Sequence, residues 1–298
     1  MTDGKSVSRR AYVAETLAGY RPKVSETLAH AIIAKHPGSA VLLYGSGISV
    51  LQESNPADIL YDFYVIVPSY KAAYKSFFFK AFNRTIPPNV FYIEEKSEYG
   101  LLRAKYAVLS IEHFEKLVSN KTFHSYFWAR FAQPSRFIAG PDELRERITD
   151  CVVTSVDSFV ANAASLLDDD ASVTDIWQAG LSSSYKAELR AEAPDRVEKL
   201  LKAYGDWPAE VTNLDIEKYK SAPLSWRLRV VQGGFLSVFR LVKGLMTFEG
   251  GMDYIAWKIS RHAGFNLPVK EWERRWPVMG VPSLARRYYK LKRAHNRP

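Results

Sequence analysis

The sequence predicts an α+β or α/β fold for the front of the chain, followed by a helical part and a basic, aromatic C-terminal segment. Short apolar runs interleave with amphipathic segments over about the first 135 residues, which is typical of strands alternating with helices. From about residue 140 the apolar side chains recur at helical spacing instead. We therefore divide the chain into residues 1–138, 139–232 and 233–298.

The expected elements of the front begin with an amphipathic helix over Val24–Lys35, which ends at Pro37-Gly38. Ala40–Tyr44 is a short apolar run and Ile59–Val67 a longer one, so both are interpreted as buried strands. The remaining elements expected here are a helix over 71–82 and strands over 89–93 and 103–109.

The expected elements of the second part are all helices. Pro141-Asp142-Glu143 is a typical helix start, and an apolar face runs from Leu144 to Ala163 before the acidic residues 168–170. Further helical segments are expected over 173–180, 195–204 and 234–248.

Composition excludes several classes of protein. The 298 residues are 47% hydrophobic and 24% charged, which is typical of a soluble globular protein and excludes a disordered chain. The single cysteine, Cys151, excludes a disulfide framework and a cysteine-based zinc site. The sequence contains no run of about 18 uncharged apolar residues, and its start lacks the apolar core of a secretion signal. We therefore expect a cytoplasmic protein.

The positive charge lies in the C-terminal segment. The net charge is +9, and residues 254–298 contain eleven basic and two acidic residues, so the rest of the chain is neutral. The same segment holds Trp257, Trp272 and Trp276. Aromatic side chains beside cations suit the interface of an anionic bilayer, and they also suit nucleic acid. The third interpretation is a solvated extension whose aromatic side chains pack on the body.

A Gly-Ser-Gly turn and an acidic residue mark the candidate site. Gly45, Ser46 and Gly47 directly follow the first expected strand, and Asp62 lies on the second. Tyr44 precludes a nucleophile elbow, and the Gly-Lys-Ser/Thr of a Walker loop is absent. What remains is typical of a polymerase-β-like nucleotidyltransferase. In such a site glycines let backbone N–H groups approach a triphosphate, and strand carboxylates hold Mg²⁺.

The second metal-binding acid of such a site is not evident. Two acids at i and i+2 would share one face of a strand, but the residue two positions after Asp62 is Tyr64. Asp58, before the strand, or Glu94 or Glu95, at the end of the next one, could complete the site. We take Asp62 and Asp58 as the candidate metal ligands.

Six stretches follow one another in the order of a known family: 43–48 with Gln52, 62–65, 104–110, 129–134, 179–182 and 188–190. They resemble the mitochondrial-type phosphatidate cytidylyltransferases, which are peripheral CDP-diacylglycerol synthases with bacterial relatives. The resemblance covers about residues 40–200. It departs after the acidic strand, where the family's Trp-His-x-x-Asn is replaced by Ser69–Tyr74, and residues beyond Gly250 do not align.

This resemblance implies a nucleotidyltransferase domain, a winged-helix-like helical domain and a C-terminal segment that touches the membrane. It implies CTP and phosphatidic acid as substrates and Mg²⁺ as cofactor, with the enzyme peripheral on the inner face of the cell membrane. Nucleic acid is then not an expected partner. The residues implicated are Gly45, Ser46 and Gly47 for the CTP phosphates, Asp62, Lys105 and Arg130 for catalysis, and Ser182 and Arg190 from the second domain.

Two alternatives stay open. The chain could transfer a nucleotide to another acceptor, either a soluble compound or RNA. It could also be a degenerate nucleotide-binding membrane adaptor, because a second acid is absent at position 64.

Overall fold

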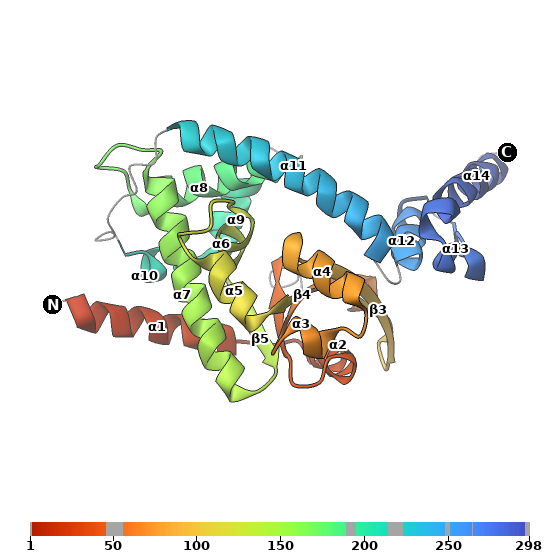
Figure 1. The fold of residues 1–298 in the computed structure, drawn as a ribbon, viewed down its shortest axis with the longest axis horizontal. Coiled ribbons are helices and arrows are strands. Elements are labelled where there is room, and N and C mark those ends of the chain that lie inside the picture. Colours follow the sequence, from red (N-terminus) through yellow and green to blue (C-terminus); the bar gives the residue numbers. More distant parts are fainter. Residues whose placement is uncertain are drawn as a thin grey trace.

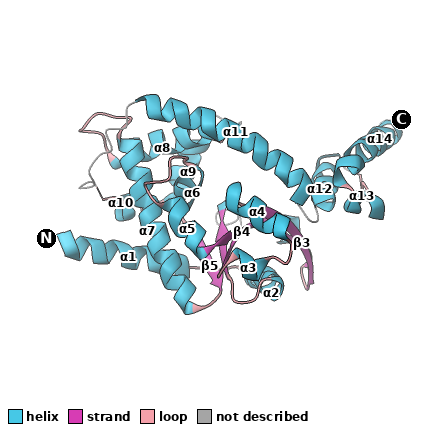
Figure 2. Cartoon of the chain, viewed as in Figure 1, coloured by secondary structure: helices cyan, strands magenta, loops and turns pink. Residues whose placement is uncertain are grey.

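The computed structural model describes residues 2–45, 56–188, 195–213, 223–247, 251–263 and 265–295. At its centre is a mixed five-stranded sheet with the strand order β3-β4-β2-β1-β5 (Figures 1 and 2). The fold of the front is therefore mixed α/β, as predicted. Its strands are β1 (Ala40–Tyr44), β2 (Leu60–Val67), β3 (Asn89–Ser97), β4 (Gly100–Ser110) and β5 (Ser135–Ala139).

The register of the sheet brings distant parts of the sequence side by side. Strand β1 pairs antiparallel with both β2 and β5, and β4 pairs antiparallel with β3. Strand β2 pairs parallel with β4, so the chain must cross over between them. In this parallel pair Asp62 lies opposite Lys105. Two residues 43 positions apart are thereby placed on neighbouring strands.

Both faces of the sheet are buried. One face packs on α2 (Lys23–Lys35) through Val24, Leu28 and Ile32. The other face forms the larger core with α1 (Thr2–Ala18), α5 (Ile111–Val118), α6 (Tyr126–Phe131) and α7 (Asp142–Ala164). Burial on two sides explains why β1 and β2 are nearly continuous apolar runs in the sequence.

The helical second part packs against the larger core. Glycine at position 180 lets α7 and α8 approach closely, because a Cβ atom there would lie 2.5 Å from Cζ of Phe159. The described residues from 140 to 232 are helices and connections, so they contain no β-wing of a winged-helix domain. The helices of this part after α7 are α8 (Val173–Ala187), α9 (Arg196–Tyr204), α10 (Trp207–Val211) and α11 (Pro223–Thr247).

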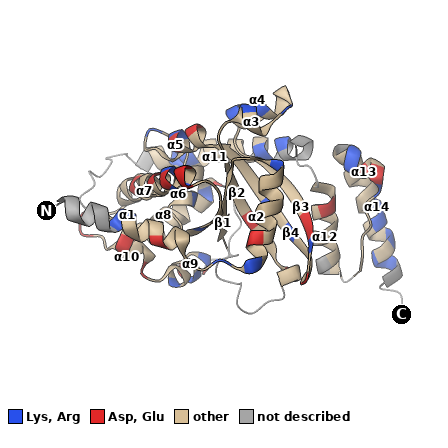
Figure 3. Cartoon of the chain, turned by 90° about the horizontal axis from the view of Figure 1, so that it is seen from below, with Lys and Arg blue, Asp and Glu red and all other residues tan. Residues whose placement is uncertain are grey.

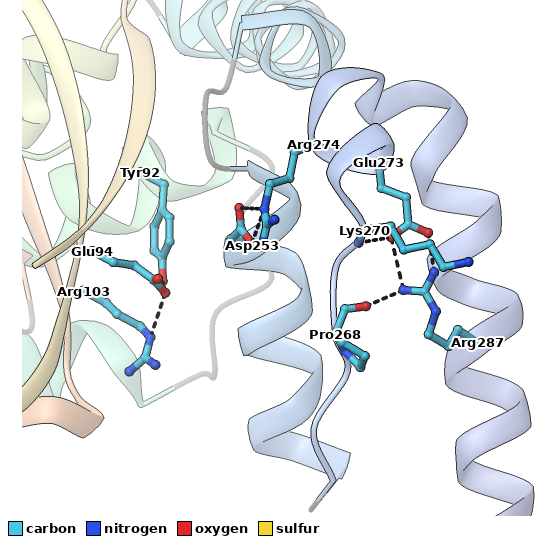
Figure 4. Close-up of polar contacts among 9 residues, drawn as sticks. All are labelled: Tyr92, Glu94, Arg103, Asp253, Pro268, Lys270, Glu273, Arg274 and Arg287. Atoms are coloured by element: carbon cyan, nitrogen blue, oxygen red, sulfur yellow. Dashed lines mark hydrogen bonds and ion pairs between the residues drawn. The ribbon is translucent and has the colours of Figure 1, made fainter.

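The C-terminal residues form a small helical unit (Figure 4). Helices α12 (Gly251–Ala263), α13 (Glu271–Arg275) and α14 (Pro277–His295) share a core that includes Met252, Leu267 and Leu284. The buried carboxylate of Glu273 pairs with Arg287 at 2.5 Å, and Asp253 pairs with Arg274 at 2.9 Å. None of the described helices is both long enough and apolar enough to pass through a bilayer.

Part of this unit packs on the sheet, as the third interpretation of the charged segment expected. The ring of Tyr254 lies 5.8 Å from that of Tyr92 on β3, and the Arg103 guanidinium lies 5.4 Å from the Trp257 ring. The other two tryptophans stay exposed, Trp272 at 43% and Trp276 at 59%. Figure 3 shows basic residues along α13 and α14.

Three expectations about the elements need correction. The helix expected over 71–82 is divided into α3 (Tyr70–Ala73) and α4 (Phe77–Thr85), because Tyr74 is extended. Helix α11 begins at Pro223, so the boundary at 232/233 falls inside a helix. Helix α1 and strand β5 are additional elements, and both contribute to the site described next.

Candidate functional site

A cavity of about 450 Å³ lies between the sheet and helices α1, α6, α8, α9 and α10. It brings together four residues that the sequence analysis singled out: Gly45, Asp62, Lys105 and Arg130. Among the described residues that line it, Asp62 is the one acidic side chain. The full lining is Tyr12, Thr16, Tyr44, Gly45, Asp62, Lys105, Arg130, Gln133, Pro134, Arg136, Tyr185, Arg196, Leu200, Ala203, Tyr204 and Trp207.

Asp62 and Lys105 form an ion pair within the sheet. Lys105 Nζ lies 2.9 Å from Asp62 Oδ1, and the two side chains are 31% and 27% exposed. Burial lowers the pKa of Lys105, but the nearby negative charge of Asp62 outweighs it, so the net effect is a raised pKa. Lys105 is therefore a cation at neutral pH. The pair presents both charges at the cavity wall, where Lys105 can also meet a phosphate group.

Arg130 is held by a second, more deeply buried ion pair. Its Nη2 atom donates to Glu188 Oε2 at 2.9 Å, and the two side chains are 12% and 8% exposed. The guanidinium also lies 4.8 Å from the ring of Tyr126 and 5.5 Å from that of Tyr44. Burial opposes its charge, yet these tyrosines and Glu188 raise its pKa well above the ordinary value. This pair joins the sheet-containing front to the end of α8.

The turn after β1 lies only partly within the described residues. Gly45 has a φ of +78°, a left-handed conformation that favours glycine, and no atom of the described residues lies within 4 Å of the position of a Cβ atom. None of the described side chains therefore covers this glycine at the cavity wall. Ser46, Gly47 and Arg190 fall outside the described residues.

Two predicted site residues do not reach this cavity. Asp58 ends a short 3₁₀ turn, Pro56–Asp58, and its side chain is exposed away from the cavity lining. Ser182 lines a separate hollow near Asp168, Asp170 and Asp175. Within the described residues, Asp58 as a metal ligand beside Asp62 and Ser182 as a substrate contact from the second domain are therefore not brought to this cavity.

The position two residues after Asp62 is part of the core. Tyr64 is fully buried, and its ring lies 4.7 Å from Tyr44 and 4.6 Å from Phe131. Glu94 accepts hydrogen bonds from Tyr92 and Arg103 and does not line the cavity. A second metal-binding carboxylate is thus absent from the described lining.

Asp62 is the candidate ligand for Mg²⁺ among the described residues. Within the described ranges no group of three or more His, Cys, Asp or Glu side chains could hold a metal ion by itself. Mg²⁺ commonly keeps several waters and binds one or two carboxylates together with the phosphates of a substrate. The partly exposed carboxylate of Asp62 fits this mode of binding, because it lines a cavity that also contains the cations Lys105, Arg130 and Arg136.

Sequence reasoning missed the cavity residues that α1, α9 and the edge strand β5 contribute. Arg136 comes from β5, Arg196 from α9, and Tyr12 from α1. Tyr204 Oη, on α9, donates to Gln133 Oε1 at 2.7 Å and closes one side of the cavity. Arg136, two residues after Pro134, was the available signal, but β5 begins with Ser135 and Arg136 and so lacks the continuous apolar run that identified β1.

Neither a protein-family model nor a curated protein sequence matches this chain.

Proposed function

We propose that this chain is a CTP-dependent nucleotidyltransferase and, more specifically, a phosphatidate cytidylyltransferase. It would transfer CMP from CTP to phosphatidic acid and release CDP-diacylglycerol and pyrophosphate. The observation that carries the proposal is the convergence of Gly45, Asp62, Lys105 and Arg130 on one cavity. A mixed sheet that places an acidic strand beside a glycine turn is compatible with a polymerase-β-like nucleotidyltransferase domain.

Each of these residues has a role that follows from its chemistry. The open backbone at Gly45 lets N–H groups approach phosphate oxygens. Lys105 and Arg130 supply positive charge where negative charge must accumulate on phosphates. Asp62 would hold Mg²⁺, which when bound neutralises charge on the triphosphate. Together these groups can orient a nucleoside triphosphate and stabilise a pyrophosphate leaving group.

The transfer step needs little acid–base chemistry. An oxygen of the phosphatidate phosphate attacks the α-phosphorus of CTP and forms a new P–O bond. The bond between the α-phosphorus and the bridging oxygen breaks, and pyrophosphate leaves with that electron pair. Because the nucleophile is already an anion, no general base is required, and no histidine is among the residues that line the cavity. Catalysis is then mainly positioning and electrostatic stabilisation.

The acceptor is a bilayer lipid, so the enzyme would work as a cytoplasmic protein peripheral on the inner face of the cell membrane. The C-terminal helical unit supplies a contact surface for this purpose. Trp276 and Met279 are 59% and 70% exposed, and Tyr289 is 63% exposed among basic residues of α14. Aromatic side chains and cations together suit the headgroup region of an anionic membrane.

The experiment that tests the proposal uses labelled CTP with Mg²⁺ and vesicles that contain phosphatidic acid. Chloroform-soluble CDP-lipid is the expected product, and it should be absent without phosphatidic acid. A water-soluble nucleotidyl product with a different acceptor would contradict the lipid acceptor and support the first alternative.

A second candidate function is nucleotide binding without transfer. The burial of Tyr64 and the exposure of Asp58 favour it, because together they leave Asp62 as the one carboxylate among the described lining residues. Metal-dependent release of pyrophosphate from CTP would exclude this candidate. Binding of CTP with no pyrophosphate release under any acceptor would support it.

A further inference from the structure

Arg136 is a cation of the cavity that none of the described carboxylates neutralises. Lys105 is paired with Asp62, and Arg130 with Glu188. Arg136 instead donates from Nη1 to the carbonyl oxygen of the adjacent Ser135, at 3.1 Å. Its Nε atom is buried without a hydrogen-bond partner, and none of the described carboxylates forms an ion pair with it. The guanidinium lines the cavity, and its Nη2 group has no partner among the described residues.

The surroundings of Arg136 hold the side chain in place, but the described residues do not pair with its charge. It packs against Gly19, where a Cβ atom would lie 3.1 Å from Nε. Burial lowers its pKa, with only a small opposing effect from Tyr12, so the protein bears a desolvation cost without an ion pair to offset it. An arginine remains charged even so, and its planar donors match the oxygens of a phosphate. An anionic ligand would supply the missing partner.

The register of the sheet separates this arginine from the Asp62 region. Arg136 is paired with Leu43 on β1, and Leu43 is paired with Phe63 on β2, the residue after Asp62. The backbones of Arg136 and Phe63 are therefore two strand spacings apart, about 10 Å, and because adjacent residues of a strand point to opposite faces, the side chain of Asp62 leaves the sheet on the other face from that of Arg136. The edge strand β5 places Arg136 on the cavity wall beside Thr16 of α1. A phosphate bound there would be distinct from one bound at Asp62 and Lys105.

We infer that Arg136 forms a second anion position in this cavity and that it binds the phosphate monoester of the acceptor. The identity of the acceptor rests on the proposed function, whereas the anion position rests on the unpaired guanidinium alone. A transferase that joins two phosphorylated substrates needs two such positions. The Asp62–Lys105 end then holds the nucleoside triphosphate, and Arg136 holds the acceptor phosphate that must reach the α-phosphorus.

The test compares Arg136→Gln and Arg136→Lys with wild type in binding titrations. The probes are CTP with Mg²⁺, inorganic phosphate and a short-chain phosphatidate below its micelle concentration. We expect Arg136→Gln to weaken phosphate and phosphatidate binding at least tenfold while CTP affinity stays within twofold. Arg136→Lys should recover part of the loss. Arg84→Gln, on the exposed face of α4, is the matched control and should change nothing.

Three outcomes would overturn the inference. Equal loss of CTP affinity would assign Arg136 to the nucleotide. A lower melting temperature with unchanged phosphate affinity would make Arg136 structural, and wild type that binds neither phosphate nor phosphatidate would remove the anion position. Failure of the proposed function gives a different result. Wild type would then make no CDP-lipid, but it would still bind inorganic phosphate, and Arg136→Gln would still weaken that binding. In steady-state assays the expected result is a raised KM for phosphatidate with an unchanged KM for CTP.

Discussion

The carboxylate of Asp62 pairs with the Lys105 ammonium, and in the proposed function it would also hold the metal that accompanies a nucleotide. We expect Asp62→Asn to reduce CMP transfer at least a hundredfold, because the amide cannot replace the charge that holds Mg²⁺. The same change leaves Lys105 without its ion pair at 2.9 Å and lowers the melting temperature by a few degrees. Initial rates with labelled CTP and thermal unfolding of the same protein measure the two effects separately.

A double variant separates catalysis from stability at this pair. Asp62→Asn with Lys105→Met removes both charges, so the melting temperature should return toward that of wild type while transfer stays absent. Transfer that persists in Asp62→Asn would remove Asp62 from the site, whatever its effect on stability.

Three histidines, His36 buried and His113 and His124 partly buried, make the stability of the fold depend on pH. Burial first, and nearby cations second, lower the pKa of His36, His113 and His124 to about 4. The unfolded chain protonates these groups near pH 6.5, so it binds more protons than the folded chain between pH 6.5 and pH 4. Stability is therefore present above pH 6.5 and is lost as the pH falls, by at most about 1.4 kcal/mol per pH unit for each histidine.

The contribution of one histidine can be isolated. His36 lies among aromatic rings, 5.7 Å from that of Tyr106 and 6.3 Å from that of Phe91, so phenylalanine is a reasonable replacement. Urea denaturation at pH 7 and pH 5 should show a smaller loss of stability for His36→Phe than for wild type. An identical loss in both proteins would show that His36 does not contribute.

At the scale of whole elements, the contact between α7 and α8 depends on the absence of a side chain at Gly180. A methyl group there would lie 2.5 Å from Cζ of Phe159 and 2.7 Å from Cβ of Ala163, both fully buried. We expect Gly180→Ala to destabilise the protein by about 1–3 kcal/mol, because overpacking forces the helices apart. Chemical denaturation measures this, with Gln178→Ala on the exposed side of α8 as control. Equal stability of the two variants would contradict the close approach.

The elements that the sequence predicted are those whose pattern is set locally. Strands β1 and β2 are apolar on both faces, so they are evident as continuous runs, and their antiparallel pairing brings Gly45 and Asp62 to one cavity. Strand β5 is as short as β1, but it begins with Ser135 and Arg136 instead of an apolar run, and its place at the sheet edge follows from pairing with β1. Gly180, by contrast, could not be recognised from its sequence neighbours as the point where α7 and α8 pack closely.

The partners of the charged residues could not be predicted in the same way. Glu188 meets Arg130 across 58 positions of sequence, and Asp58 turns outward although it precedes Asp62 by only four residues. Both outcomes depend on how the helical part packs on the sheet. Sequence patterns describe which face of an element is apolar, but they do not describe which elements that face meets.

At the scale of the whole molecule, the C-terminal helices carry a positively charged, aromatic surface that is separate from the cavity lining. We expect the chain to sediment with vesicles that contain anionic lipid and to be released by high salt. The variant Trp276→Ser/Met279→Ser should bind such vesicles at least tenfold more weakly, because two exposed apolar side chains are lost. Unchanged sedimentation of this variant would exclude α13 and α14 as the contact.

The control for this experiment is a residue of similar exposure elsewhere. Tyr20, between α1 and α2, is 75% exposed, and Tyr20→Ser should leave vesicle binding unchanged. Point substitutions are preferable to deletion of the C-terminal unit, because Tyr254 and Trp257 pack on the sheet and their removal would disturb the body.

The buried link between Arg130 and Glu188 restricts how this protein can diverge. Replacing either residue alone would leave an unpaired charge in the interior. The cost is about 3–5 kcal/mol, a large part of the stability of a typical domain. A substitution at one of the two positions alone is therefore poorly tolerated, whereas a simultaneous change of both residues can be tolerated. Among relatives of this chain, positions 130 and 188 are expected to covary or to remain fixed together.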